Sequence, residues 1–281
     1  MNRYRITIAV VLLLGIIICP GLASAEIDWW IDQTIKLDEK PLDTAMSVSG
    51  TYLFALTDDG IVHAYDSDGN IKGEIYVGKN VDHIDCGPEE NILILNSKKN
   101  REIQKIVFEF IEAINTEGSP FKGNADAPIV IAVFTDYQCP YCARLWSLLE
   151  KVLNNNKDTV RIVSKNYPLP MHGYARYAAA AALAAFKMGK FREFDEALFR
   201  NAHELSDDKL LEIATGLGLD PDEFEKEMKS QEIQRKIEKD MMEAEKVGIT
   251  GTPTVFINGR KLRNRTLDGF QDIINSLLNK Q

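Results

Sequence analysis

The chain has 281 residues, a formal net charge of −9 and 45% hydrophobic residues, and only four of its residues are cysteines. A chain of this length buries a core without help from disulfides, and its length predicts two domains. The balance of 33 Lys and Arg against 42 Asp and Glu, with no basic cluster, argues against a nucleic-acid partner.

Residues 1–25 have the pattern of a secretory signal peptide. Arg3 and Arg5 precede an apolar run from Ile6 to Cys19, and Ala23-Ser24-Ala25 supplies small residues for cleavage. The run is 14 residues long, whereas a membrane-spanning helix needs about 20, so a permanent anchor is the weaker interpretation. We expect cleavage after Ala25 and a periplasmic or otherwise extracytoplasmic location. Loss of the two arginines would move the net charge from −9 to −11.

Residues 26–115 are predicted to form a small antiparallel β domain. Short apolar runs alternate with Asp-Gly turns at Asp59-Gly60 and Asp68-Gly69, which are strong hairpin signals. Leu53–Thr57 and Ile92–Asn96 align at an offset of 39 residues, and this spacing resembles the blade-like repeats of β-propellers. Two such units cannot close a ring. We therefore expect them to pack on each other, on the other domain or on a second chain.

Residues 116–281 change to an α/β pattern. Ile129–Thr135 predicts a buried strand, Pro140 to about Asn156 a helix, and Val160–Ser164 a second, parallel strand. A helical insertion follows at about 172–246. A hairpin turning at Asn258-Gly259 and a last helix over Leu267–Leu278 complete the domain. The helices of the insertion are predicted at Tyr174–Met188, Phe191–Asn201, after Ser206, Pro221–Lys229 and Gln231–Lys246.

A Cys-Pro-Tyr-Cys motif lies between the first strand of this domain and its first helix. A thiolate at a helix N-terminus is stabilised by free backbone N–H groups and by the helix dipole, so Cys139 is the predicted nucleophile. Pro140 fits the first helical turn, where its missing N–H costs nothing. Cys142 lies one turn further on and is predicted to resolve a mixed disulfide formed at Cys139.

Two other interpretations of the cysteine pair are weaker. A zinc site needs further ligands, but Cys86 lies in the other domain and the four histidines show no paired spacing, so no metal is expected. A purely structural bridge would close too short a loop to contribute much stability. Redox chemistry at Cys139 and Cys142 is therefore the prediction, and export to an oxidising compartment agrees with it.

Four motifs, in this order along the chain, resemble the DsbA-like family of thioredoxin-fold thiol-disulfide oxidoreductases. The resemblance implies a thioredoxin-like α/β fold with an inserted helical subdomain, preceded here by the small β domain. It also implies that Pro253 is a cis-proline facing the cysteines. Pro140, Tyr141, Thr252 and Pro253 are then expected to contact the substrate, and no cofactor is needed. The motifs are Ala127–Val130, Phe134–Cys142, Tyr167–Pro170 and Gly251–Gly259.

The residues leave open the direction of thiol-disulfide exchange, and they indicate only the class of the partners. The family chemistry implies protein or peptide substrates with thiols or disulfides, and a membrane redox partner that recycles the cysteine pair. Oxidation of substrates is slightly favoured. A dimeric isomerase or reductase, with the N-terminal domain as the dimerisation device, is the alternative, and a binding module with a redox domain attached is another. Asp136 and Lys165 are either proton relays or solvated charges, and Cys86 is expected to pack in the β domain.

Overall fold

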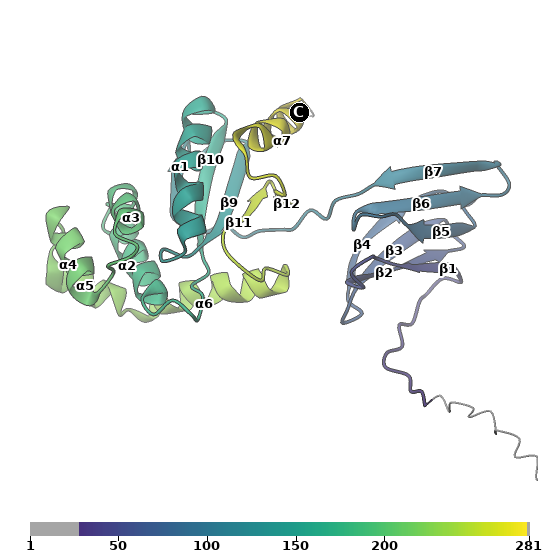
Figure 1. Ribbon diagram of the computed structural model, residues 1–281, viewed down its shortest axis with the longest axis horizontal. Helices are drawn as coiled ribbons and strands as arrows, with labels where there is room; N and C mark the ends of the chain where they lie inside the picture. The colour runs from purple at the N-terminus through teal and green to yellow at the C-terminus, as the bar shows by residue number, and fades with distance from the viewer. Residues whose placement is uncertain (1–27, 280–281) are drawn as a thin grey trace, which may run out of the picture.

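The computed structural model describes residues 28–279 and has two lobes joined by a single connecting segment (Figure 1). The predicted signal peptide lies outside the described residues. Within residues 28–279, no helix is both long enough and apolar enough to cross a membrane.

The N-terminal lobe contains two antiparallel sheets. The first is a four-stranded meander in the order β1-β2-β3-β4, and the second is a three-stranded meander in the order β5-β6-β7. Positive-φ glycines occupy the tight turns, for example Gly60 between β2 and β3 and Gly69 between β3 and β4, where a side chain would be strained. The strands are β1 Pro41–Met46, β2 Tyr52–Thr57, β3 Ile61–Asp66, β4 Ile71–Tyr76, β5 His83–Cys86, β6 Ile92–Ser97 and β7 Glu102–Val107.

The two sheets share one hydrophobic core. Of the three arrangements that we expected for the two repeat units, the structure has the one in which they pack on each other. Four residues buried in this core follow the 39-residue offset found in the sequence. Phe54 of β2 corresponds to Leu93 of β6, and Leu56 corresponds to Leu95. The Asp43 carboxylate of β1 accepts a hydrogen bond from the Ile84 backbone N–H of β5 at 2.8 Å, which joins the two sheets. The likeness to propeller blades stays a prediction.

A five-stranded mixed sheet forms the centre of the C-terminal lobe, in the order β12-β11-β9-β10-β8. β9 (Ile129–Thr135) and β10 (Val160–Asn166) are parallel, and β11 (Thr254–Ile257) runs antiparallel to β9. Short strands close both edges: β12 (Arg260–Lys261) and β8 (Phe121–Gly123). The sequence did not indicate β8, because a strand of three residues that includes Lys and Gly has little strand signal of its own.

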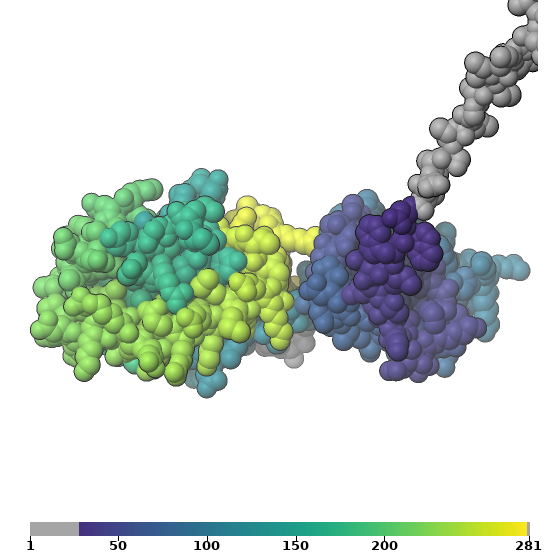
Figure 2. Space-filling model, turned by 90° about the horizontal axis from the view of Figure 1, so that it is seen from below, coloured from purple at the N-terminus to yellow at the C-terminus, as the bar shows by residue number. Residues whose placement is uncertain are grey.

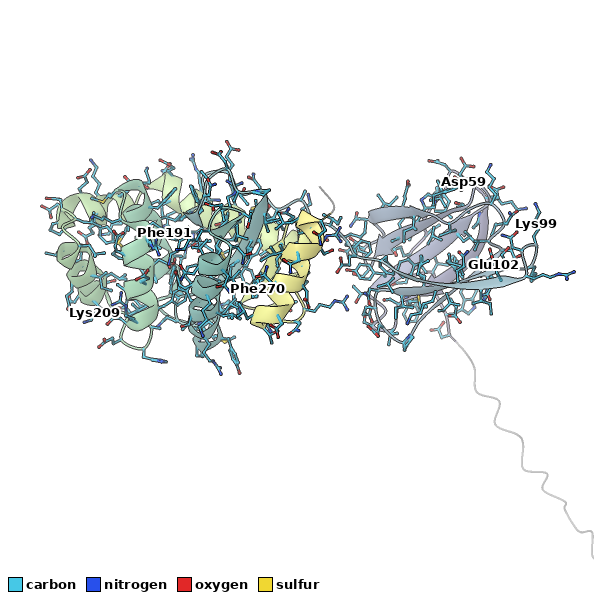
Figure 3. The ribbon with its side chains drawn as sticks, turned by 90° about the horizontal axis from the view of Figure 1, so that it is seen from above. Asp59, Lys99, Glu102, Phe191, Lys209 and Phe270 are labelled. Carbon is cyan, nitrogen blue, oxygen red and sulfur yellow. The ribbon has the colours of Figure 1, made fainter. Side chains whose placement is uncertain are left out.

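Helices cover both faces of this sheet. α1 (Pro140–Asn155) and α7 (Leu267–Leu278) pack on one face, where Leu149 and Phe270 are fully buried against β9 and β11. Figure 3 shows Phe270 on the side of α7 that faces the sheet. α6 (Gln231–Lys246) covers the other face through Ala244, which packs with Phe134 and Phe256.

The helical insertion has a core of its own. It is built around the alanine-rich helix α2 (Ala175–Lys187), whose small side chains let three short helices approach closely. Phe191, Phe194 and Phe224 are buried in this core, and Figure 3 labels Phe191 within the insertion. The three helices are α3 Phe191–Arg200, α4 Asp207–Gly216 and α5 Pro221–Met228.

The connecting segment after β7 contacts both lobes. Ile111 forms a β-bridge with Arg260 of β12, and Arg260 also makes an ion pair with Glu109 at 2.6 Å. Lys72 of β4 makes an ion pair with Glu112 at 3.2 Å from the other side. In Figure 2 the lobes are separate masses of atoms that meet at this narrow contact.

Candidate active site

Cys139 lies where β9 passes into α1. It is the N-cap residue of α1, and its carbonyl accepts the first helical hydrogen bonds from the backbone N–H groups of Cys142 at 3.0 Å and Ala143 at 3.2 Å. Pro140 occupies the first turn, and that turn holds no acidic side chain. A negative charge on Cys139 therefore faces free N–H groups and the positive end of the helix dipole, with no carboxylate on the first turn to oppose it.

The two cysteines and the Thr252-Pro253 loop come together at this point. Both cysteines are free thiols; Cys139 is 3% exposed and Cys142 1% exposed. The Cys139 Sγ donates to the Thr252 carbonyl oxygen at a distance of 3.6 Å. The Thr252-Pro253 peptide bond is cis, as the resemblance implied. The fold thus brings the Gly251–Gly259 motif to the Phe134–Cys142 motif across 113 residues of chain.

The thiol of Cys142 is held in its neutral form. Burial raises the pKa of Cys142 to about 12, against the opposing effects of the Thr135 hydroxyl, the Asp136 backbone N–H and the Thr252 hydroxyl. Within the described part of the chain, the buried hydroxyls of Thr135 and Thr252 have no hydrogen-bond partner of good geometry. Both hydroxyls are therefore available as donors if a negative charge forms on the Cys142 sulfur.

Asp136 organises the loops beside the cysteines. Its carboxylate accepts hydrogen bonds from the backbone N–H groups of Gln138 and Leu169, each at 2.8 Å, and contacts the His172 Nδ1 at 2.8 Å. The carboxylate is therefore fully engaged in holding the 167–174 loop to the loop before Cys139. Our sequence reasoning did not identify His172; its only signal was its position after the Tyr-Pro-Leu-Pro motif.

Lys165 takes part in a buried charge network. Its ammonium group contacts Asp240 at 2.6 Å and Glu243 at 2.8 Å, and donates to the Asn115 carbonyl at 2.7 Å. Burial lowers the pKa of Lys165, but the two carboxylates outweigh burial and the net shift is upward. These contacts tie β10, α6 and the connecting segment together. Because only 2% of its side chain is exposed, Lys165 is not the solvated charge that the sequence offered as one alternative, and the proton relay stays a prediction.

A groove begins beside the cysteines. Among the predicted substrate-contact residues, Tyr141, Thr252 and Pro253 line it, and Tyr141 is 63% exposed. Pro140 is not among the lining residues. Four further residues complete the wall of the groove: Arg144, Leu145, Leu148 and Arg265. Our sequence reasoning missed them because they lie outside the motifs, farther along α1 and in the loop after β12. The groove has a volume of about 500 Å³.

Neither a metal centre nor a third site cysteine is found in the described residues. Among residues 28–279, no three His, Cys, Asp or Glu side chains are placed to hold a metal ion. Cys86 is half-buried at the core of the N-terminal lobe, far along the chain from the motif, and burial raises its pKa.

A mixed sheet with a helical insertion and a cysteine pair at the start of its first helix defines the class of DsbA-like thiol-disulfide oxidoreductase folds. A family model described as thioredoxin matches residues 115–276, more than half of the chain. The chain therefore belongs to this thioredoxin family.

Solved structures agree with this assignment. A thioredoxin-like oxidoreductase from Silicibacter pomeroyi is 28% identical, with a TM-score of 0.52 over 58% of this chain and 94% of the other. BdbD from Bacillus subtilis is 25% identical, with a TM-score of 0.54 over 59% and 95%. The thiol-disulfide exchange protein α-DsbA2 from Wolbachia pipientis, at 23% identity and a TM-score of 0.52 over 57% and 88%, shares the fold.

Curated relatives match a little over half of the chain. The Na⁺/H⁺ antiporter NhaA 3 of Salinispora tropica is 31% identical over 156 residues, which are 55% of this chain and 24% of the relative. The antiporter NhaA 1 of Mycobacterium sp. strain KMS is 28% identical over 154 residues, 54% of this chain and 25% of the relative. The chain thus spans about a quarter of the length of the curated relatives it matches.

Proposed function

We propose that the protein is an exported thiol-disulfide oxidoreductase that acts on protein or peptide substrates, with Cys139 as nucleophile and Cys142 as resolving thiol. The observation that carries the proposal is the pair of free thiols at the N-terminus of α1, with the Cys139 Sγ 3.6 Å from the Thr252 carbonyl oxygen. Tyr141, Thr252 and Pro253 line the groove beside the reacting sulfur, and Pro140 follows Cys139 in the first turn of α1.

The chemistry is two successive exchanges of sulfur partners. In the reducing direction, the Cys139 thiolate attacks one sulfur of a substrate disulfide, a Cys139–substrate disulfide forms, and the other substrate sulfur leaves as a thiolate that takes up a proton. Cys142 then loses its proton and attacks Cys139, which releases the second substrate thiol. In the oxidising direction the same steps run backwards, and a substrate dithiol passes two electrons and two protons to the Cys139–Cys142 disulfide.

The Thr252 backbone is suited to hold the substrate. An extended peptide can pair with an exposed backbone segment as an added strand. Since the Thr252 carbonyl already accepts from Cys139, a substrate bound along this loop would lie with its cysteine against the nucleophile.

Serine variants test the assignment. Cys139→Ser should reduce catalysed exchange on a scrambled or reduced test protein to the rate without protein. Cys142→Ser should retain the first step and accumulate a mixed disulfide that mass spectrometry detects. Cys86→Ser is the matched control and should exchange like the parent chain. Undiminished exchange by Cys139→Ser would rule out the proposal.

For direction, we favour oxidation of substrates by an extracytoplasmic protein that a membrane partner reoxidises. The alternative is a dimeric isomerase or reductase. The Cys139–Cys142 reduction potential, the resting redox state in cells and the mass in solution separate the two. A strongly oxidising potential in a monomer supports the oxidase, and a reduced resting site in a dimer supports the isomerase.

The N-terminal lobe is a second candidate for function, as a binding or dimerisation module. The observation that favours it is the exposure of large apolar side chains on two of its edge strands: Ile71 and Tyr76 on β4, and Ile103 and Val107 on β7. Exposed edge strands with apolar side chains accept partner chains. A Val107→Lys variant that loses self-association or capture of one substrate, with unchanged exchange on generic peptides, would support this role.

A further inference from the structure

The groove beside the cysteines is positively charged, although the chain as a whole is acidic. Two arginines, Arg144 and Arg265, line the groove, and no Asp or Glu is among its lining residues. The formal net charge of the chain is −9. The charge of the groove is therefore local and opposite in sign to the long-range field of the molecule.

Both arginines are held at the groove by the site itself. Arg144 lies over the Tyr141 ring, with its guanidinium carbon 4.6 Å from the ring centre, and its Nε donates to the Pro140 carbonyl at 3.4 Å. The Arg265 Nη1 donates to the Pro253 carbonyl at 2.6 Å. Within the described residues, neither guanidinium has a carboxylate within ion-pair distance, in contrast to Arg176, Arg192 and Arg260. Two fixed positive charges thus have spare donors toward whatever occupies the groove.

Two leucines contribute apolar surface to the groove. Leu145 and Leu148 follow Arg144 on α1, and both line the groove. A peptide that extends from the Thr252-Pro253 loop into the groove therefore meets both apolar side chains and guanidinium groups.

We propose that this groove selects substrates that carry an acidic side chain, together with an apolar one, within a few residues of the reacting cysteine. Arg144 and Arg265 are the specificity-determining residues, and Leu145 and Leu148 take the apolar side chain. The inference rests on the proposed exchange activity and names its substrate class. Because the net charge of the molecule repels acidic peptides at long range, a preference for them can arise only from local charges such as these.

The expected size of the preference follows from the exposure of both arginines. Each exposed ion pair contributes little free energy. A Glu in the peptide is attracted by both arginines and a Lys is repelled by both, so exchanging Glu for Lys should change the exchange rate roughly 5- to 20-fold at low salt. The Debye length falls to about 3 Å at 1 M salt, so the preference should shrink steeply as salt is added.

The test uses the reduced full chain and three peptides, each closed by one internal disulfide. The peptides are identical except for one residue next to the reacting cysteine, which is Glu, Gln or Lys. Second-order exchange rates are measured by acid quenching and mass spectrometry. Each rate is divided by the rate of the same peptide with dithiothreitol, an uncharged thiol, which removes the effect of the flanking charge on the disulfide itself.

The parent chain should react in the order Glu, Gln, Lys, with the ratio of Glu to Lys between roughly 5 and 20 at low salt and near one at high salt. Arg144→Glu should abolish or invert the order, and Arg144→Gln should give an intermediate ratio. Lys99→Glu changes the net charge by the same amount at the outer end of the N-terminal lobe (Figure 3) and should keep the parent ratio. Circular dichroism confirms that each variant is folded.

Equal normalised rates for the three peptides, within twofold, would overturn the inference and leave the exchange activity standing. Equal shifts in Arg144→Glu and Lys99→Glu would also overturn it, because the effect would then belong to net charge. If the parent chain and Cys139→Ser both exchanged every peptide only at the uncatalysed rate, that result would instead contradict the proposed function.

Discussion

At Cys142, burial and hydrogen-bond donors act on the thiol in opposite directions. Burial is the larger effect and brings its pKa to about 12, while the hydroxyls of Thr135 and Thr252 and the Asp136 N–H reduce the shift. A resolving thiol must become a thiolate during the second exchange, so these donors are of use only at that moment. In the resting state, the Thr135 hydroxyl is a buried polar group without a partner in the described part of the chain.

Thr135→Val should separate stability from exchange. The variant has nearly the same shape but no hydroxyl, so the pKa of Cys142 should rise further and the mixed disulfide should resolve several-fold more slowly. The reduced protein should be as stable as the parent or up to about 1 kcal/mol more stable, since an unsatisfied buried hydroxyl is removed. Quenched-flow trapping of the mixed disulfide and urea unfolding measure the two effects.

Thr135→Ser is the matched control, because it keeps the hydroxyl, and its resolution rate should stay near that of the parent. A Thr135→Val variant that resolves the mixed disulfide as fast as the parent would show that the hydroxyl does not act on Cys142.

At the scale of the elements, the edge strand β8 is joined to α1 and α3 by one buried cation. Lys122 contacts Glu150 of α1 at 2.8 Å and Asp195 of α3 at 3.1 Å, and its ammonium group lies 4.7 Å from the centre of the Trp146 ring. Tyr137, in the loop before Cys139, donates to Asp195 at 2.8 Å. The cluster therefore connects the cysteine loop to the helical insertion through the buried charges of Lys122 and Asp195, while Glu150 is partly exposed.

Lys122→Met should lower the free energy of unfolding by about 3 to 5 kcal/mol at pH 8, because Asp195 would remain as a buried charge without its partner. Burial raises the pKa of Asp195 from 3.8 to about 6, against the effects of Lys122 and Tyr137. A raised folded-state pKa means that the contribution of Asp195 to stability is complete below about pH 4 and is lost as the pH rises through about 6. The effect of the substitution should therefore be smaller at pH 5 than at pH 8.

Denaturant unfolding of the reduced protein at the two pH values checks this expectation. Arg192→Met is the control, since Arg192 contacts the same Glu150 at 3.7 Å from an exposed position and should contribute less than about 1 kcal/mol at either pH. A pH-independent loss in Lys122→Met would show that Asp195 does not titrate between these values.

At the scale of the whole molecule, the two lobes meet through the connecting segment rather than through a broad interface. Ile111 and Glu112 lie along β12, while Ile114 packs against the sheet with Phe134 and Phe256. Asn115 is fixed at both backbone groups: its N–H donates to Glu243 at 2.7 Å and its carbonyl accepts from the buried Lys165. The last two residues of the predicted N-terminal domain thus contact the C-terminal lobe.

Two deletions that differ by two residues should behave differently. Removal of residues 26–113 should leave a folded C-terminal lobe whose exchange on a generic disulfide peptide stays within about twofold of the parent. Removal of residues 26–115 also takes away the packing of Ile114 and the Asn115 carbonyl that accepts from Lys165. The free energy of unfolding should therefore fall by a further amount of about 2 to 3 kcal/mol. Urea unfolding and the peptide assay compare the two chains. Equal stability would show that Ile114 and Asn115 contribute nothing to the C-terminal lobe.

The strong local patterns of the sequence predicted most elements of the fold. α1 begins at Pro140 and β9 spans Ile129–Thr135, as the apolar periodicity and the Pro-containing motif indicate. β10 runs two residues beyond its prediction, to Asn166, because pairing with β9 continues past the apolar residues. β8 escaped prediction since its pairing with β10, and not its composition, makes it a strand.

The sequence by itself determined the local arrangement on which the proposed chemistry depends: two thiols one helical turn apart, the first at a helix N-terminus. These features depend on residues that are near neighbours in the chain, and the backbone geometry of a single turn relates them. Only the tertiary structure decided what surrounds the thiols. The Thr252 carbonyl at Cys139, the arginines of the groove and the Asp136–His172 contact join segments that sheet order and helix packing bring together, and no local pattern records such contacts.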